Sequence, residues 1–379
     1  MSLADTIRAR YTMDPGEQSD FAIVGERATE VQQWLAAGLR QVMQTAGHLH
    51  REQPEAETRV VLNFIAPEAP RAYRRRAQAT FVMSVAVVDE WPVDVLKAGY
   101  TMLVRALSNI VMLVVRTEDK LHSHFITLEG GCFPIVHTIG ESDRFFERVY
   151  ERVAPLALSH LVINNQFDPD LDPSLWQGDE ITEQIYRAGK KMDDLHLLPA
   201  PWPLQDLLDT RDFDHVRRLY GIGGLSYGNF SARKDANRFW MSASGVNKSE
   251  LREPGKHILL VKGYDAARST MLLSVPPDIQ PRRVSVDAIE HWMIYTEHPS
   301  VGAIVHVHGW IDGIRSTEIN YPCGTRELAI AVADLVREAP DPARAIIGQR
   351  NHGMTITGPS LDDIFDRIDG KVSNQVPMS

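Results

Sequence analysis

Cysteine is nearly absent from this chain: Cys132 and Cys323 are the only two among 379 residues. Two thiols are too few for a disulfide framework, and they are too few for a zinc site built from cysteines. Any metal ion must therefore be held by histidine and carboxylate side chains. No nucleophile signature surrounds Cys132, so we expect it to be a buried structural thiol.

Long apolar stretches are also missing. No run approaches the ~20 residues needed to cross a bilayer, and the N-terminus, MSLADTIRARYTMDPGEQSD, lacks the apolar core of a secretory signal. We therefore expect a cytoplasmic protein without a membrane partner.

A long basic run is missing too: the chain has 40 Lys and Arg against 50 Asp and Glu, and its formal net charge is -10. The densest basic cluster is RAYRRRAQ, residues 71–78. Such a cluster is typical of a basic helix end or strand edge. The functional alternative is a phosphate-binding segment. Nucleic acid is not an expected partner.

What the chain does contain is enough sequence for two α/β domains. In the first half, helical periodicity predicts a helix over 21–47, and a β-branched, apolar segment predicts a buried strand over 78–90. Residues 164–206 are rich in Asp, Asn and Pro, which favours a linker. We therefore expect an N-terminal α/β domain over 1–200 and a second domain over 201–379. The N-terminal domain has three candidate roles: it could control access to a site, mediate oligomerisation or bind a second ligand.

Two histidines end a predicted strand in GAIVHVHG. Residues two apart in a strand face the same side, so His306 and His308 can converge on one ion. A catalytic zinc needs a third protein ligand, and His352 in the turn RNHGM is a candidate. The spacing alone is weak, since His122 and His124 repeat it without a third ligand nearby. A strand edge explains that second pair more simply.

The sequence around these histidines resembles the class II aldolase/adducin family. Five stretches follow the family's order, and together they cover about residues 205–370: GIGGLSYGNFSAR, MSASGVNKSEL, SVDAIEHWMIYTEHPSVGAIVHVHG, YPCGTRELAIAVADLV and RNHGMTITGPSLDDIFDRI. The resemblance implies that 201–379 form a three-layer α/β/α class II aldolase-like domain that binds a metal and carries the catalytic site. The N-terminal domain resembles no family that we recognise.

The resemblance implies a metal site made by His306, His308 and His352, for Zn²⁺ or another divalent metal such as Mn²⁺, Co²⁺ or Fe²⁺. It also implies a catalytic acid/base at Asp287, where the family usually has Glu. Aspartate is one methylene shorter, so either the backbone compensates or the chemistry differs from plain aldol cleavage. Alternatively, Asp287 simply opens a helix as an N-terminal carboxylate.

The substrate-binding residues implied by the resemblance are in glycine-rich loops: Gly228, Asn229, Ser244, Gly245 and Ser285. Amides and hydroxyls flanked by glycine suit an anionic small-molecule substrate, although tight-turn chemistry alone would explain the same residues.

The activity implied by the resemblance is that of a metal-dependent lyase. It would act on a sugar phosphate or hydroxy acid through a metal-stabilised enediolate, with aldol cleavage or condensation as the first choice. A dehydratase or decarboxylase on the same scaffold is the alternative, as is a non-catalytic binding or assembly protein. Family members are often tetramers, so we expect a homo-oligomer, with a tetramer as the first choice.

Overall fold

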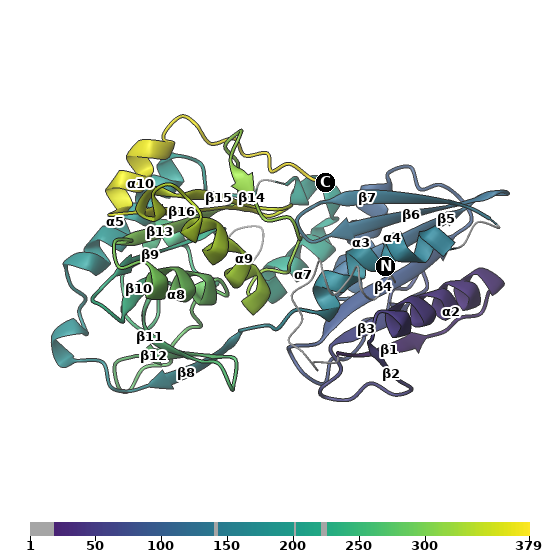
Figure 1. Cartoon of the computed structure of the whole chain (residues 1–379), viewed down its shortest axis with the longest axis horizontal. Coiled ribbons are helices and arrows are strands. Elements are labelled where there is room, and N and C mark those ends of the chain that lie inside the picture. Colours follow the sequence, from purple (N-terminus) through teal and green to yellow (C-terminus); the bar gives the residue numbers. More distant parts are fainter. Residues whose placement is uncertain (1–18, 140–142, 201, 221–225) are drawn as a thin grey trace. The chain divides into compact units, whose positions relative to one another are not determined.

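The computed structural model describes residues 19–139, 143–200, 202–220 and 226–379 (Figure 1). The chain divides into two compact units: the first runs to Ser159 and takes in Gln205–Asp212, and the second comprises His160–Leu204 and Phe213–Ser379. The sequence places the boundary near residue 200, whereas the structure assigns 160–204 to the second unit. The N-terminal segment discussed above, apart from its last two residues, and the glycine-rich positions 221–225 lie outside the described residues.

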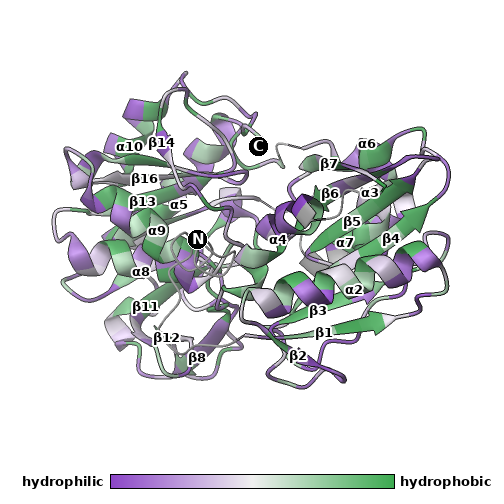
Figure 2. Cartoon of the chain, turned by 45° about the vertical axis from the view of Figure 1, so that its right-hand side comes forward, coloured by the Kyte–Doolittle hydropathy of each residue, from purple (hydrophilic) through white to green (hydrophobic). Residues whose placement is uncertain are grey.

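A seven-stranded sheet, in the order β2-β1-β3-β4-β5-β6-β7, is the centre of the first unit. The first five strands in this order run parallel, and β6 and β7 are antiparallel to their neighbours. Strands β3 to β5 are almost continuously apolar (green in Figure 2) and buried, as expected for parallel strands. The strands and the helices are β1 (Asp20–Gly25), α2 (Glu30–Thr45), β2 (Leu49–Arg51), β3 (Val60–Phe64), β4 (Phe81–Val88), α3 (Val95–Arg105), β5 (Ile110–Arg116), β6 (Lys120–Thr127), β7 (Cys132–Thr138) and α4 (Asp143–Ala157).

The predicted helix over 21–47 is two elements, because its first residues form β1. A short apolar run such as FAIVG fits a strand or a helix equally well by periodicity alone. Gly25, at φ +87, follows a left-handed path that ends the strand. Thr29 then starts α2, with a capping box in which Thr29 and Gln32 bond each other's backbone N–H.

The second unit is built on a nine-stranded mixed sheet, in the order β14-β15-β16-β13-β9-β10-β11-β12-β8. Its strands are β8 (Asn164–Asp168), β9 (Asn229–Arg233), β10 (Phe239–Ser242), β11 (Ile258–Asp265), β12 (Thr270–Ser274), β13 (Ala303–Val307), β14 (Arg315–Ser316), β15 (Ile346–Gln349) and β16 (Gly353–Gly358). The helices of the remaining chain are α5 (Glu180–Asp194), α6 (Leu204–Leu207), α7 (Thr210–Tyr220), α8 (Ala288–Glu297), α9 (Arg326–Arg337) and α10 (Leu361–Ile368), with short 3-10 turns at Pro173–Leu175, Lys248–Glu250 and Pro342–Arg344.

Helices cover both faces of this sheet, which confirms the predicted three-layer α/β/α arrangement. Successive residues of a strand point to opposite faces. On β9 the ring of Phe230 faces Gly189 of α5, while the hydroxyl of the next residue, Ser231, bonds the ring of His291 on α8. Helices α5 and α10 pack together, as do α8 and α9.

Residues 164–206, which the composition predicts to be linker-like, hold a strand and a helix instead. Strand β8 pairs in parallel with β12 at the sheet edge. Asp179 caps α5 by accepting bonds from the N–H groups of Ile181 and Thr182. The polar composition reflects an edge strand and a helix with one exposed face.

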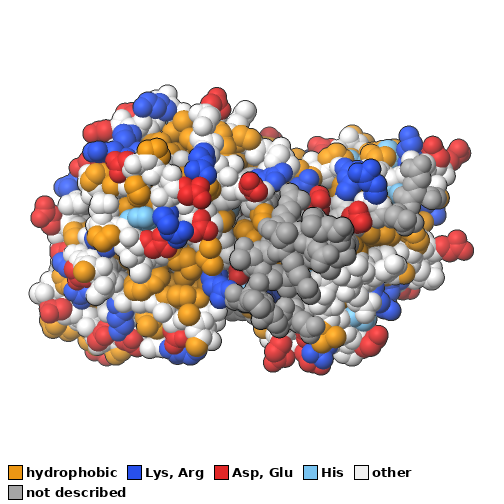
Figure 3. Space-filling view, in the orientation of Figure 1, with side chains coloured by type: hydrophobic (Ala, Val, Ile, Leu, Met, Phe, Trp, Pro, Cys, Tyr) orange, Lys and Arg blue, Asp and Glu red, His pale blue; other side chains and the backbone are white. Residues whose placement is uncertain are grey.

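The described residues include no helix long and apolar enough to cross a membrane. On the face drawn in Figure 3, basic and acidic side chains are interspersed.

Candidate metal centre

The pairing of β13 with β16 brings the three predicted ligands together. His306 lies within β13, His308 follows that strand directly, and His352 occupies the turn that leads into β16. The two strands are antiparallel, with Val307 opposite Met354. A Cβ on Gly353 would lie 2.3 Å from the carbonyl oxygen of Val307. This position therefore requires glycine, and the two backbones can approach closely enough to juxtapose the imidazoles.

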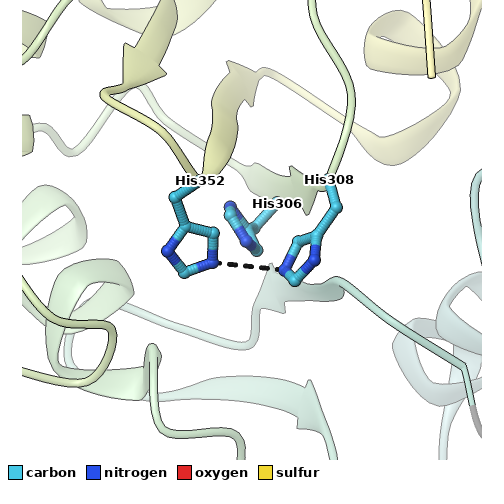
Figure 4. Close-up of side chains that lie close together, drawn as sticks. All are labelled: His306, His308 and His352. Atoms are coloured by element: carbon cyan, nitrogen blue, oxygen red, sulfur yellow. Dashed lines mark hydrogen bonds between the residues drawn. The ribbon is translucent and has the colours of Figure 1, made fainter. Parts of the chain in front are cut away.

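The three rings face one another around a common point (Figure 4). Their centroids are 5.1 Å apart for His306 and His308, 5.0 Å for His306 and His352, and 4.8 Å for His308 and His352. One nitrogen from each ring lies within 4.8 Å of the other two. Among the described residues, this is the one group of three or more ligand-type side chains that meets so closely.

Three of the six ring nitrogens lack the hydrogen-bond partners that buried polar atoms normally have. Both nitrogens of His306 and Nδ1 of His308 are buried without a hydrogen bond, whereas Nε2 of His308 and Nε2 of His352 lie 3.2 Å apart. Leaving such atoms unpaired is costly, and a shared cation would satisfy them. The donor set therefore fits a divalent metal.

Protonation favours the same conclusion. Burial lowers the pKa of His306 and of His352 to about 4 and holds the pKa of His308 well below its ordinary value. All three imidazoles are neutral at pH 7, and the neutral ring is the form that binds a metal.

The second His-x-His pair lies in a different environment. His122 and His124 sit on β6, beside the exposed indole of Trp91, with ring centroids 4.9 and 5.8 Å from it. Sγ of Cys132 lies 3.8 Å from Nδ1 of His124, but within the described residues the pair is not part of a close group of three ligand-type side chains. The predicted strand edge is wrong, because both histidines lie inside β6, which pairs with β5 on one side and with β7 on the other. The pair still serves as a control for the first His-x-His pair.

Asp287 lies at the start of α8, but its carboxylate does not cap that helix. Oδ2 accepts a 2.7 Å hydrogen bond from Nδ2 of Asn229, and Oδ1 accepts one from Sγ of Cys323 at 3.2 Å. The carboxylate is buried and close enough to His352 to oppose electrostatically the fall in that histidine's pKa. The geometry thus favours a role at the site over simple helix initiation.

Gly228 and Asn229 enter the site through β9, the other neighbour of β13. Asn229 is opposite His306 in the strand register. Gly228 has φ +68, and a Cβ there would lie 2.4 Å from the carbonyl oxygen of His306. The glycine therefore permits a close approach to the backbone of a proposed ligand, which is a structural reason for its presence.

The remaining predicted substrate residues lie together on two paired segments. Ala243 forms a bridge with Val284, and the N–H of Ser244 donates to the carbonyl of Arg283. This pairing brings Ser244 and the exposed Gly245 alongside the segment that carries Ser285. None of the hydrogen bonds between described residues connects these loops to the three histidines.

A buried lysine at the site was missed by the sequence prediction. Lys248 is 4% exposed, and its Nζ donates a 2.7 Å bond to the carbonyl of Ser226. Burial lowers the pKa of Lys248 to about 8, against the opposing effect of the Asp287 carboxylate. The sequence shows only a lysine in a polar loop, SGVNKSEL, and gives no signal that this amine is buried.

Glu290 is the second buried charge-bearing residue beside the site. Its carboxyl accepts hydrogen bonds from Nε2 of Gln349, at 2.8 Å, and from the hydroxyl of Thr355. Burial, helped by the nearby Asp287 carboxylate, raises the pKa of Glu290 well above its ordinary value. It links α8 to strands β15 and β16, one turn away from Asp287.

Two aromatic rings cover His308. Trp202 stacks on it, with centroids 5.7 Å apart and planes at 22°, and Tyr227 lies 5.3 Å away. Such rings exclude water from one side of the site and fix the plane of the imidazole.

Two glycines with nearly the same backbone angle test how crowding at Gly228 affects the site. Gly228 and Gly245 have φ of +68 and +69, but a Cβ at Gly245 meets nothing within 4 Å. We expect Gly245→Ala to cost about 1 kcal/mol of strain, and Gly228→Ala to cost roughly 2–4 kcal/mol and to weaken zinc binding at least tenfold. Urea unfolding and zinc titration measure both effects; equal losses in the two variants would contradict this assignment.

Comparison with known proteins finds a family model that matches part of the second unit. Residues 216–310 match the model of the Class II Aldolase and Adducin N-terminal domain. Methylthioribulose-1-phosphate dehydratase of Leptospira biflexa serovar Patoc is 26% identical over 137 residues, which are 34% of this chain and 61% of the relative. The same-named protein of Pseudomonas aeruginosa strain LESB58 is 30% identical over 108 residues, 27% of this chain and 46% of the relative. The chain thus spans less than two thirds of either relative.

Solved structures with a similar arrangement have low identity. An L-fuculose 1-phosphate aldolase aligns with a TM-score of 0.36 and 16% identity, covering 51% of this chain and 81% of that protein. The L-fuculose-1-phosphate aldolase from Thermus thermophilus gives a TM-score of 0.31 and 18% identity, covering 49% of this chain and 86% of that protein.

Proposed function

We propose that this chain, which carries a class II aldolase and adducin N-terminal domain at residues 216–310, is a divalent-metal-dependent lyase. The proposed ligands are His306, His308 and His352, with Zn²⁺ as the first choice and Mn²⁺, Co²⁺ or Fe²⁺ as alternatives. The observation that carries the proposal is the meeting of three imidazoles, two buried and one partly buried, with three ring nitrogens of His306 and His308 left without a hydrogen-bond partner.

A divalent ion at this position supplies Lewis acidity, which lowers the free energy of the negative charge that develops on a carbonyl oxygen. The chain itself supplies a base at Asp287. Its carboxylate accepts two hydrogen bonds and keeps further lone pairs for a substrate proton. Asn229 holds Oδ2, so the carboxylate keeps one orientation during proton transfer.

The proposed substrate is a small hydroxy-carbonyl compound with an anionic end. The loops at Gly228–Asn229 and at Ser244–Gly245, together with Ser285, are the proposed binding segments for that end, because exposed amides and hydroxyls beside glycine suit phosphate or carboxylate. Lys248 adds a buried cation near Asp287, and its charge favours an anionic substrate or transition state.

Two reactions fit this set of groups. The curated relatives are named dehydratases, which favours elimination. In this step Asp287 removes the proton next to the carbonyl and returns it to the hydroxyl on the next carbon, which leaves as water. Aldol cleavage is the second candidate, since the sequence resemblance predicts it; the same carboxylate would then take the hydroxyl proton while the carbon–carbon bond breaks. Decarboxylation remains a further prediction on the same scaffold.

A non-catalytic binding protein is the alternative, and such a protein would not need these histidines to bind a metal.

A cytoplasmic location and a homo-oligomer, with a tetramer as the first choice, remain predictions from the sequence.

The two His-x-His pairs provide a matched test of the metal site. We expect wild-type protein to hold about one divalent ion per chain, and His306→Ala/His308→Ala to hold less than about a tenth of that, because two of three ligands are removed. His122→Ala/His124→Ala should retain the wild-type content. Elemental analysis by mass spectrometry, with circular dichroism as a check on folding, measures this. Equal metal content in all three proteins would refute the site.

Asp287 is tested by an isosteric substitution. Asp287→Asn removes the base but keeps the shape, so we expect kcat to fall about 10²–10⁴-fold while metal content stays constant. Glu290→Gln is the matched control, because the raised pKa of Glu290 favours a neutral carboxyl that glutamine imitates; its kcat should stay within about threefold. Assays use phosphorylated ketoses and hydroxy acids. Full activity in Asp287→Asn would exclude this role.

The pKa of Lys248 predicts a decrease in kcat/KM at alkaline pH. The amine is charged below its pKa of about 8, so kcat/KM for an anionic substrate should fall as the pH rises through that value and the cation is lost. Lys248→Met should remove this decrease and lower kcat/KM at least tenfold at pH 7, because a buried charge interaction is lost. Lys256→Met, at a partly exposed lysine paired with Glu253, should keep the wild-type profile. If Lys248→Met still showed the same decrease in kcat/KM, the titrating group would be a residue other than Lys248.

A further inference from the structure

The first unit contains a cavity of about 1200 Å³ that the proposed function does not use. Its walls include the residues that follow β1, β2 and β3. Strand β1 lies between β2 and β3 in the sheet. The chain passes from β1 to β2 on one side of β1, and then crosses to β3 on the other side. The carboxyl ends of β1 and β3 therefore form a topological switch point, and open parallel sheets bind ligands in the crevice at that position.

The floor of this cavity is rigid backbone. A Cβ on Gly25 would lie 2.0 Å from the carbonyl oxygen of Phe64, so the ends of β1 and β3 are pressed together and only glycine fits. Val24, Phe64 and Ile65 contribute apolar surface to the lining. One part of a ligand bound here would therefore face an apolar wall.

Positive charge is concentrated on another wall, although the whole chain is acidic. Arg71, Arg74, Arg75 and Arg76 line the cavity together with a single carboxylate, Glu26. These arginines belong to the basic cluster 71–78, which the proposed function leaves unexplained. Four arginines that line one cavity give it a net positive charge, which a bound anion would offset.

The arginine segment is held in place from two sides. Nδ2 of Asn63, at the cavity, donates a 3.0 Å bond to the carbonyl of Arg71. A guanidinium nitrogen of Arg75 lies 2.8 Å from both the carbonyl of Leu107 and Oδ1 of Asn109.

The other three arginine side chains remain available. Arg71, Arg74 and Arg76 are exposed, and within the described part of the chain their guanidinium groups form no ion pair or hydrogen bond. A positioned segment with available guanidinium groups needs little ordering to bind an anion.

We propose that this cavity binds a phosphorylated small molecule of about nucleotide size, with its phosphate against Arg71, Arg74 and Arg76. The planar guanidinium fork matches phosphate oxygens in pairs. The volume exceeds the roughly 300–1,000 Å³ of ordinary small-molecule pockets, so there is room for an apolar or ring-shaped part against Phe64 and Ile65. Glu26 is available to accept hydrogen bonds from hydroxyls of the same ligand.

Calorimetric titration of the full chain with AMP, with pyrophosphate and with adenosine tests the proposal. Low ionic strength is used because salt screens exposed charges. Pyrophosphate and AMP should bind, and adenosine should bind at least about tenfold more weakly than AMP because it lacks the phosphate. Arg71→Gln/Arg74→Gln/Arg76→Gln should weaken both phosphate probes at least about tenfold.

The matched control changes the same charge elsewhere in the first unit. Arg40, Arg144 and Arg148 are exposed and do not line the cavity; their triple Gln variant should bind within about twofold of wild type. The titrations are repeated in His306→Ala/His308→Ala, which removes the proposed metal site and leaves this cavity intact, so the two proposals fail separately.

Hydrogen exchange locates the bound probe. Protection should appear in peptides covering 24–32 and 63–76. The proposal is overturned if neither phosphate probe binds, if both triple variants lose affinity equally, or if protection is confined to the second unit.

Discussion

The close pairing of β13 with β16 is the constraint on which the site depends. The turn that carries His352 follows His308 by more than forty residues in the sequence. It lies beside His308 because Gly353 lets β16 approach the carbonyl of Val307. On the other side of β13, Gly228 permits an equally close approach of β9. Three neighbouring strands thus bring their polar ends to one point. The sheet that stabilises the second unit also fixes the spacing of the imidazoles, and packed strands hold such spacing more tightly than flexible loops do.

A buried polar layer between this sheet and α8 orients the groups around the histidines. Ser231 bonds both His291 and Tyr295, Asn229 bonds Asp287, and Thr355 bonds Glu290. Buried polar groups are tolerated when they are paired, and a paired network specifies one arrangement. The N-terminus of α8 is therefore held against the sheet, and Asp287 faces the site while the next helical turn carries Glu290, whose pKa is raised by burial. This arrangement places a buried carboxylate and the buried amine of Lys248 beside the three imidazoles.

Much of the site could be predicted from the sequence, because strand geometry alone puts His306 and His308 on one face and the family resemblance identifies His352 and Asp287. The fold of the second unit was predicted from the same resemblance. Other features depend on contacts that no local pattern records. Lys248 looks like an ordinary loop residue until the fold buries it, and Asp-rich residues near 164 look like a linker until β8 pairs with β12. The cavity in the first unit required the strand order, which periodicity does not provide.

Three imidazole nitrogens binding one divalent ion are the central claim. X-ray absorption at the zinc edge of the purified, zinc-loaded chain tests this directly. We predict a shell of nitrogen or oxygen scatterers at about 2.0–2.1 Å with the multiple-scattering pattern of imidazole rings, fitted by three histidines. A sulfur shell near about 2.3 Å, or a spectrum of hydrated zinc without imidazole scattering, would contradict it.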